Sequence, residues 1–101
     1  MESRAVISNE VLARYAADAA REVEGVRSLA DSHLRRQKGV SVRAGENGIS
    51  VELHLVVDYG SSIPPIAREV QQRVRQYLKV MADIDPARVE VVIVGVEPLS
   101  P

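Results

Sequence analysis

The sequence contains no cysteine, no phenylalanine and no tryptophan. The lack of cysteine excludes disulfides, thiolate metal sites and cysteine nucleophiles. Without Phe and Trp, the core must be built from Val, Ile, Leu, Ala and the three Tyr. Neither charge is in marked excess, with 13 Lys and Arg against 14 Asp and Glu. Because nucleic-acid-binding domains usually carry a strong basic excess, this balance argues against a dedicated nucleic-acid binder.

Long apolar segments are also missing. The longest apolar runs, such as residues 91–94, are far too short to span a bilayer, and the N-terminus lacks an apolar core of signal-peptide length. We therefore expect a cytoplasmic protein without direct membrane insertion, whose contact with a membrane would come through a partner. A chain of 101 residues suits a single domain, here 1–101, with 97–101 as a frayed tail.

The centre of the chain predicts a strand that turns into a helix. Apolar and polar residues alternate from Ile49 to Asp58, which is the period of a strand with one buried face. From Ile63 onward the apolar residues recur at helical spacing, after a serine, Ser61 or Ser62, that we expect to cap the helix. Pro86 is expected to end this helix, because proline disfavours helical geometry in the residue before it.

Hydrophobic periodicity and turn residues also predict the elements on either side. These are a helix over 9–24 closed by Gly25, an edge strand over 26–30, a loop over 31–38, a strand over 40–44 and a last strand over 88–96. Asn47-Gly48 predicts a hairpin between the strands at 40–44 and 49–58, because both residues tolerate positive φ. The last strand should run parallel to the second hairpin strand. The predicted fold class is α+β: a two-layer sandwich in which two helices cover one face of a small mixed sheet.

Residue sets that could carry chemistry are few. Glu52, His54 and Asp58 share one face of the predicted strand and could form an acid–base set, but a solvated strand face gives the same alternation. We favour the solvated face. His33 and His54 have no patterned acidic partner, and no phosphate-binding glycine motif is present. We therefore expect no enzyme activity, no cofactor and no metal.

The last strand suggests an interaction surface, because its centre is apolar on both faces. If both helices cover one sheet face, apolar side chains on the other face stay exposed and favour self-association or a protein partner. Alternatively, the strand is central in the sheet and locally covered. The candidate interaction residues are Val56, Val92, Val94 and Val96.

A second candidate surface is basic. Arg68, Arg75 and Lys79 follow one outer stripe of the helix that begins at Ile63. This stripe could bind nucleic acid as a regulatory module, which is our alternative function. An ordinary solvated helix face explains the same residues, and exposed aromatic side chains for base stacking are not evident. We therefore favour a solvated helix face over a nucleic-acid partner.

Several short motifs, taken together, resemble a known family. They are Glu22-Val23-Glu24-Gly25-Val26, Gly39-Val40-Ser41-Val42, the stretch 51–60, Ile63-Pro64 and Val89-Glu90-Val91. In this order they resemble the alkaline shock protein family of envelope stress response proteins. The resemblance implies a small non-enzymatic protein, found mainly in Gram-positive bacteria, that serves cell-envelope homeostasis. It also implies self-assembly, and in some members attachment to a membrane-embedded anchor protein. Other members of the family are associated with lipid synthesis.

Overall fold

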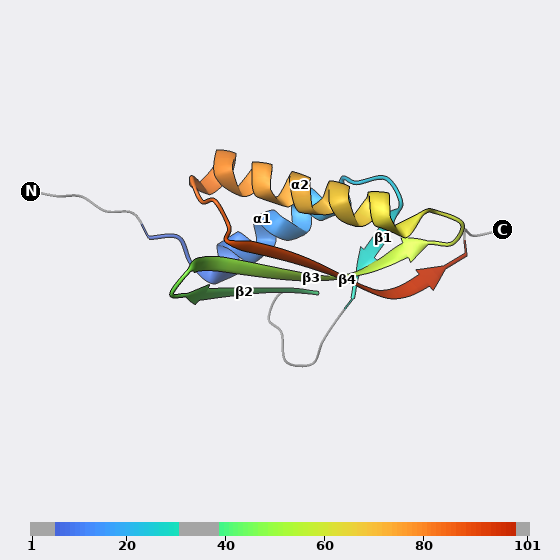
Figure 1. Cartoon of the computed structure of the whole chain (residues 1–101), viewed down its shortest axis with the longest axis horizontal. Helices are drawn as coiled ribbons and strands as arrows, with labels where there is room; N and C mark the ends of the chain where they lie inside the picture. Colours follow the sequence, from blue (N-terminus) through green and yellow to red (C-terminus); the bar gives the residue numbers. More distant parts are fainter. Residues whose placement is uncertain (1–5, 31–38, 99–101) are drawn as a thin grey trace, which may run out of the picture.

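A computed structural model describes residues 6–30 and 39–98. In chain order the elements are α1 (Asn9–Arg21), β1 (Val26–Leu29), β2 (Val40–Gly45), β3 (Gly48–Asp58), α2 (Ile63–Ala82) and β4 (Arg88–Glu97). Both helices lie on the same face of the sheet (Figure 1). The predicted α+β sandwich with a mixed sheet is therefore confirmed.

Strand β3 is the centre of the sheet. It pairs in parallel with β4 along one edge and antiparallel with both β1 and β2 along the other. Strand β1 pairs with the last part of β3 and β2 with the first part, so the two short strands follow each other along one edge. Their junction is at His54, whose N–H donates to the Gly39 carbonyl at 2.8 Å and whose carbonyl accepts from the Ala30 N–H at 2.9 Å.

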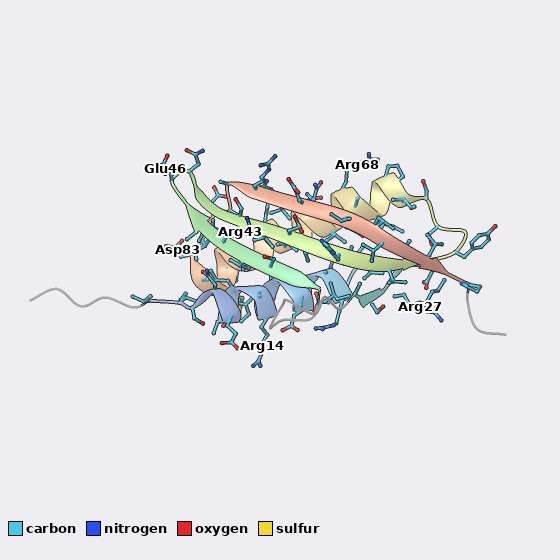
Figure 2. The ribbon with its side chains drawn as sticks, turned by 90° about the horizontal axis from the view of Figure 1, so that it is seen from below. Arg14, Arg27, Arg43, Glu46, Arg68 and Asp83 are labelled. Atoms are coloured by element: carbon cyan, nitrogen blue, oxygen red, sulfur yellow. The ribbon has the colours of Figure 1, made fainter. Side chains whose placement is uncertain are left out.

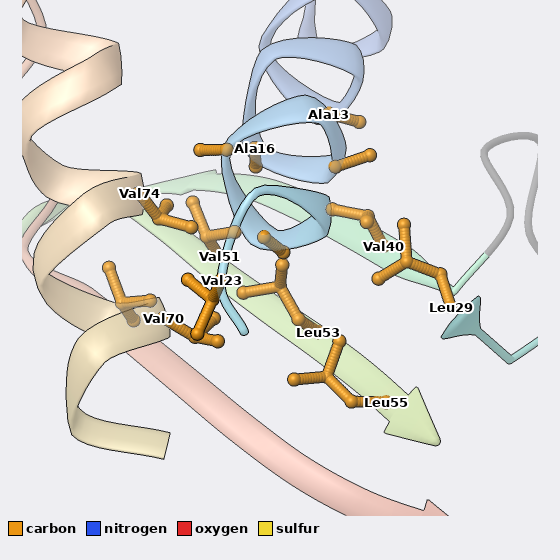
Figure 3. Packing of buried hydrophobic residues seen from close by; sticks show 14 of the residues in the cluster. Ala13, Ala16, Val23, Leu29, Val40, Val51, Leu53, Leu55, Val70 and Val74 are labelled. Carbon is orange, nitrogen blue, oxygen red and sulfur yellow. The ribbon is translucent and has the colours of Figure 1, made fainter. Parts of the chain in front are cut away.

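The core lies between the sheet and the two helices (Figure 3). Alternate side chains of β3 point into it and are at most 1% exposed: Val51, Leu53, Leu55 and Val57. Helix α2 contributes Ile66, Val70, Val74 and Leu78, whereas five of the six buried residues of α1 are alanines. Each large aliphatic side chain buried here contributes about 1.5–3 kcal/mol. The buried core of the described chain is therefore built from aliphatic residues, as the lack of Phe and Trp requires.

Both helices end differently from the prediction. Helix α1 ends at Arg21 with Glu22 as its C-cap, so the predicted end at residue 24 was too late. At the start of α2, Ser62 occupies the cap position, but its side chain makes no capping hydrogen bond. At its end, Asp83 adopts the left-handed conformation (φ 53°) and its N–H donates to the Lys79 carbonyl. The helix therefore closes three residues before Pro86, and proline is not what stops it.

The hairpin and the C-terminal end also correct details. Glu46 and Asn47 form the β2–β3 turn, and Gly48, not Asn47, carries the positive φ, at 114°. Glu97 belongs to β4, and its carbonyl accepts a 2.7 Å hydrogen bond from the Tyr59 N–H. The predicted frayed tail therefore cannot begin at residue 97. The predicted loop at 31–38 lies outside the described residues.

Candidate functional site: the outer face of the sheet

The outer face of the sheet is the face opposite α1 and α2. Figure 2 views the molecule from this side, with the strands in front of the helices. Within residues 6–30 and 39–98, no helix covers this face. Both helices therefore cover one face of the sheet and leave the other open, as the predicted exposed apolar surface requires. Strand β4 is an edge strand, so the alternative of a central, locally covered last strand is wrong.

A β-bulge in β4 changes which of its side chains share a face. Leu55 is in register with Ile93, but the next residue, Val56, is in register with Gly95, so Val94 is an extra residue. An extra residue inverts the alternation of side chains beyond it. Val92 lies beside His54 on the outer face before the bulge. Beyond the bulge Val96 lies beside Val57, which faces the helices.

The bulge divides the four predicted interaction residues. Val56 is half-buried and Val92 is 37% exposed, and both lie on the outer face. Val94, the inserted residue, is 48% exposed. Val96 is 44% exposed but belongs to the helix side of the sheet, so the expectation of one shared face was wrong for it. Whether these residues bind a partner stays a prediction.

Val56, Val92 and the inserted Val94 form an apolar strip, which ion pairs border at its C-terminal end. Arg27 is the extra residue of a second bulge, in β1. Its guanidinium donates to Asp58 at 3.1 Å and to Glu97 at 3.1 Å, which ties β1, β3 and β4 together. At the other end of β4, Arg88 pairs with Glu90 at 3.2 Å. The apolar residues of the outer face therefore lie between two charged ends.

The proposed acid–base residues divide into two groups. His54 Nε2 lies 2.8 Å from a Glu52 carboxylate oxygen. Asp58, four residues further along the strand and so about 13 Å away, is engaged by Arg27 instead. In the part of the chain that the structure describes, no three His, Asp or Glu side chains are grouped to hold a metal ion. His33 lies outside that part, and the absence of enzyme activity stays a prediction.

The basic stripe on α2 is largely engaged with its own chain. Arg75 donates to the Pro86 carbonyl at 2.7 Å, and so fixes the segment that leads into β4. Lys79 donates to Asp83 at 3.0 Å, and this hydrogen bond and the charge of Asp83 raise the pKa of the Lys79 ammonium above its ordinary value. Of the three predicted residues, Arg68 is exposed and makes no such contact with residues 6–30 or 39–98. This arrangement gives little support to a nucleic-acid surface.

Comparison with known proteins assigns the chain to a family. Residues 1–98 match the alkaline shock protein 23 family, which is described as having a cell envelope-related function. The chain belongs to this family. It is 32% identical to YqhY of Bacillus subtilis over 90% of this chain and 75% of that protein. It is 28% identical to YloU of the same organism over 94% and 89% of the two chains. Neither name states an activity.

Solved structures share the fold of this alkaline shock protein 23 family member. A variant of MamM CTD has a TM-score of 0.64 and 17% sequence identity, with 91% of this chain and 95% of that chain covered. A second variant has a TM-score of 0.57, with 87% and 98% covered. At this level of identity the likeness concerns the fold alone. The family match therefore carries the functional assignment, at the level of a cell envelope-related function.

The helix layer of this family member also has an exposed apolar surface, which was not predicted from the sequence. Val80 is 74% exposed, and the neighbouring Met81 is 45% exposed. Val80 borders a shallow groove of about 440 Å³ between α1 and α2, lined also by Ala19, Glu22, Arg73, Gln76 and Tyr77. The signal was present in the sequence, because adjacent helical residues cannot both face one core.

None of the described helices is long and apolar enough to cross a membrane.

Proposed function

We propose that this chain is a non-enzymatic protein of cell-envelope homeostasis that acts by self-association and by binding protein partners. The family supports the envelope-related role. The observation that carries the proposed mode of action is the uncovered outer face, where Val92 exposes 37% of its surface on the same face as Val56. The inserted residue Val94 follows Val92 in β4 and exposes 48%. Apolar side chains grouped on a face with no cover are typical of protein interaction sites.

The size of this apolar strip limits how strongly it can bind by itself. Complete burial of a valine contributes about 1.5–3 kcal/mol, so covering the exposed parts of these valines contributes roughly 2–3 kcal/mol in all. Association costs roughly 4–15 kcal/mol in lost translational and rotational freedom. The interface must therefore also use polar groups. The ion pairs at both ends of the strip and the open edge of β4 supply them.

The partners that we propose are a second copy of this chain and a membrane-embedded anchor protein of the kind that the family resemblance implies. The proposed location is the cytoplasm, with contact to the membrane through that anchor. In this arrangement the sheet side of the molecule binds partners while the helix side closes the core.

Light scattering coupled to size-exclusion chromatography tests self-association. We expect the mass to rise above that of the 11.0 kDa monomer as concentration increases. Val92→Ser should lower the apparent mass, because it removes apolar contact from the strip. Val80→Ser is the matched control, since it changes an exposed valine on the helix layer. A monomer mass at the highest attainable concentration would contradict self-association, and an effect of the control alone would move the interface to the helices.

Affinity capture from detergent-solubilised membranes tests the anchor. The tagged wild-type chain should retain a membrane protein that the Val92→Ser variant retains less well. Circular dichroism of both baits must show the same helix and strand content, so that loss of binding is not loss of folding. Equal retention by the two baits would place the anchor site elsewhere on the molecule.

A further inference from the structure

We propose that two copies of this chain pair through their β4 strands, antiparallel, with Val92 of one copy opposite Val92 of the other. This inference rests on the proposed self-association and specifies its geometry. The two sheets become one continuous sheet, and all four helices lie on the same side of it. The two-fold axis is perpendicular to the sheet and passes beside Val92.

Strand β4 offers the longest open edge in the described chain. It has ten residues and pairs only with β3, whereas the opposite edge of the sheet is divided between β1, with four residues, and β2, with six. Both edges carry one backbone contact from a helix: the Asn9 side-chain amide donates to the Val42 carbonyl of β2 at 3.4 Å, and the Gln71 side-chain amide donates to the Val89 carbonyl of β4 at 3.1 Å. The length of β4 is therefore what favours its edge. An edge strand carries a row of backbone donors and acceptors that a second chain can pair with.

The side-chain faces of β4 match in this register. Around the axis, Val91 of one copy lies opposite Ile93 of the other, and both face the helices. Glu90 then lies opposite the bulged pair Val94–Gly95, as two residues face one at a bulge. Beyond the bulge the alternation of side chains is inverted, so residues that face the helices in one copy again lie opposite residues that face the helices in the other. Helix-side Val89 falls opposite helix-side Val96, and the outer-face residues of the two ends also fall opposite each other.

Charge selects this register over its neighbours. With the axis at Val92, Arg88 of each copy lies opposite Glu97 of the other, and opposite charges across strands stabilise pairing. These side chains are 71% and 59% exposed, so both can reach a second partner. With the axis at Ile93, Glu90 would instead lie opposite Glu97 at both ends, which is destabilising.

The other neighbouring register loses pairs. With the axis at Val91, the last two residues of β4 would extend past Arg88 of the second copy towards Pro86, which has no N–H to donate. The register centred on Val92 is thus the one that keeps both the charges and the full strand length. It also covers Val92 and Val96, which are 37% and 44% exposed in the single chain. A contact of this kind is at the small end of specific interfaces, so a concentration-dependent dimer is expected.

Disulfide cross-linking tests the axis directly, because the chain has no cysteine of its own. Directly opposed residues of antiparallel strands have Cα atoms about 4.5–5.5 Å apart, within the roughly 4.4–6.8 Å that a disulfide needs. Purified Val92→Cys should form a covalent dimer on mild oxidation, and reduction should reverse it. Val94→Cys is the control, because its two copies would lie about 13 Å apart along the strands. It should stay largely monomeric although Val94 is the more exposed.

A mixing experiment distinguishes edge pairing from stacking of two outer faces. Val91→Cys mixed with tagged Ile93→Cys should give the mixed dimer, since these helix-side residues lie opposite each other only when the edges pair. If the two outer faces stacked instead, Val91 and Ile93 of the two copies would both point away from the interface, and both sheets would separate them. A mixed dimer therefore supports the proposal, and its absence beside an efficient Val92→Cys cross-link overturns it.

Charge complementation tests the register independently. Arg88→Glu alone and Glu97→Arg alone each place like charges opposite each other at both ends, so each should shift the monomer–dimer midpoint severalfold to higher concentration. Mixing the two variants restores opposite charges at both ends and should recover the wild-type midpoint. Changed contacts within one chain, such as that of Arg27 with Glu97, cannot produce recovery on mixing.

The outcomes separate this inference from the function on which it rests. If light scattering shows oligomers but Val94→Cys cross-links as well as Val92→Cys, the register is wrong and self-association stands. If mixing the charge variants gives no recovery, the register is also overturned. If the wild-type chain stays monomeric at the highest concentration, both the inference and the proposed self-association fail.

Discussion

Replacement of Gly39 by alanine should destabilise the fold strongly, because Gly39 lies against the backbone at the junction of β1 and β2. A Cβ atom there would lie 2.6 Å from the Ala30 carbonyl oxygen and 2.8 Å from the Ala30 nitrogen. Neither residue can move freely, since both are hydrogen-bonded to His54 of the central strand. The backbone of Gly39 also has a φ of +71°, which side chains other than glycine adopt at a cost.

The expected magnitude follows from these two effects. The left-handed backbone costs alanine about 1–2 kcal/mol, and inserting a methyl group into a filled space costs about 1–3 kcal/mol. Gly39→Ala should therefore lower the free energy of unfolding by about 2–5 kcal/mol. For a domain whose stability is of the order of 5–15 kcal/mol, this is a large fraction. Urea unfolding followed by far-UV circular dichroism measures it.

Gly60 provides the matched control. It too has a positive φ, +93°, but a Cβ atom there would meet nothing within 4 Å. Gly60→Ala should therefore show only the backbone effect, roughly 1–2 kcal/mol. The difference between the two variants measures the steric effect at the junction. If Gly39→Ala loses no more stability than Gly60→Ala, the close approach to Ala30 is not as tight as the structure shows.

Three further predictions concern the core, the strand ends and the end of α2. Leu55→Ala should lower the free energy of unfolding by about 2–5 kcal/mol, because Leu55 is fully buried in the central strand; a loss below 1 kcal/mol in urea unfolding would contradict this. Arg27→Gln should cost about 1 kcal/mol at low salt and less at high salt, since its ion pairs are partly exposed; a salt-independent loss would contradict an ionic origin. Asp83→Asn should lower the pKa of Lys79 towards its ordinary value of 10.5 in an NMR titration, because the raising carboxylate is removed. Because the folded-state pKa of Lys79 is raised, the stabilisation that goes with it is present below the unfolded-state pKa and is lost as pH rises through the folded-state pKa. On the alkaline side, the ionic part of this variant's loss should therefore vanish only at strongly alkaline pH. An unchanged Lys79 pKa in the variant would contradict the assignment.

The elements with one clear period could be predicted from the sequence. Residues 49–58 alternate because one face of β3 packs on the helices and the other does not, and this asymmetry appears directly in residue type. The parallel pairing of β4 followed from the helix that connects it to β3. The exposure of Val92 could likewise be anticipated, because a strand that is apolar on both faces exceeds what one helix layer can cover.

The bulge in β4 could not be predicted, and it governs the outer face. Residues 91–94 are all apolar, so no change of polarity marks Val94 as an extra residue. Without that knowledge, Val96 was assigned to the wrong face. The end of α2 was missed for a related reason. Asp83 adopts a left-handed conformation that favours glycine or asparagine, and residue type alone does not indicate it there.

The contacts of the basic stripe could not be predicted from the sequence either. Arg75 is engaged because the segment after α2 returns beneath it and presents the Pro86 carbonyl. A contact across eleven residues depends on the tertiary path, whereas the stripe itself depends only on helical spacing. Spacing could therefore identify which basic residues share a face, but not which of them remain available to a ligand.

The junction of β1 and β2 has a consequence for how this chain tolerates changes of length. Ala30 and Gly39 are close enough for their backbones to touch, and the eight residues between them join two points that the sheet already holds together. A connection between Ala30 and Gly39 therefore has only a short distance to span, and lengthening it adds mainly loop-closure entropy. Doubling its length costs only about 0.6 kcal/mol. A peptide or a small domain inserted there should leave the register of all four strands unchanged.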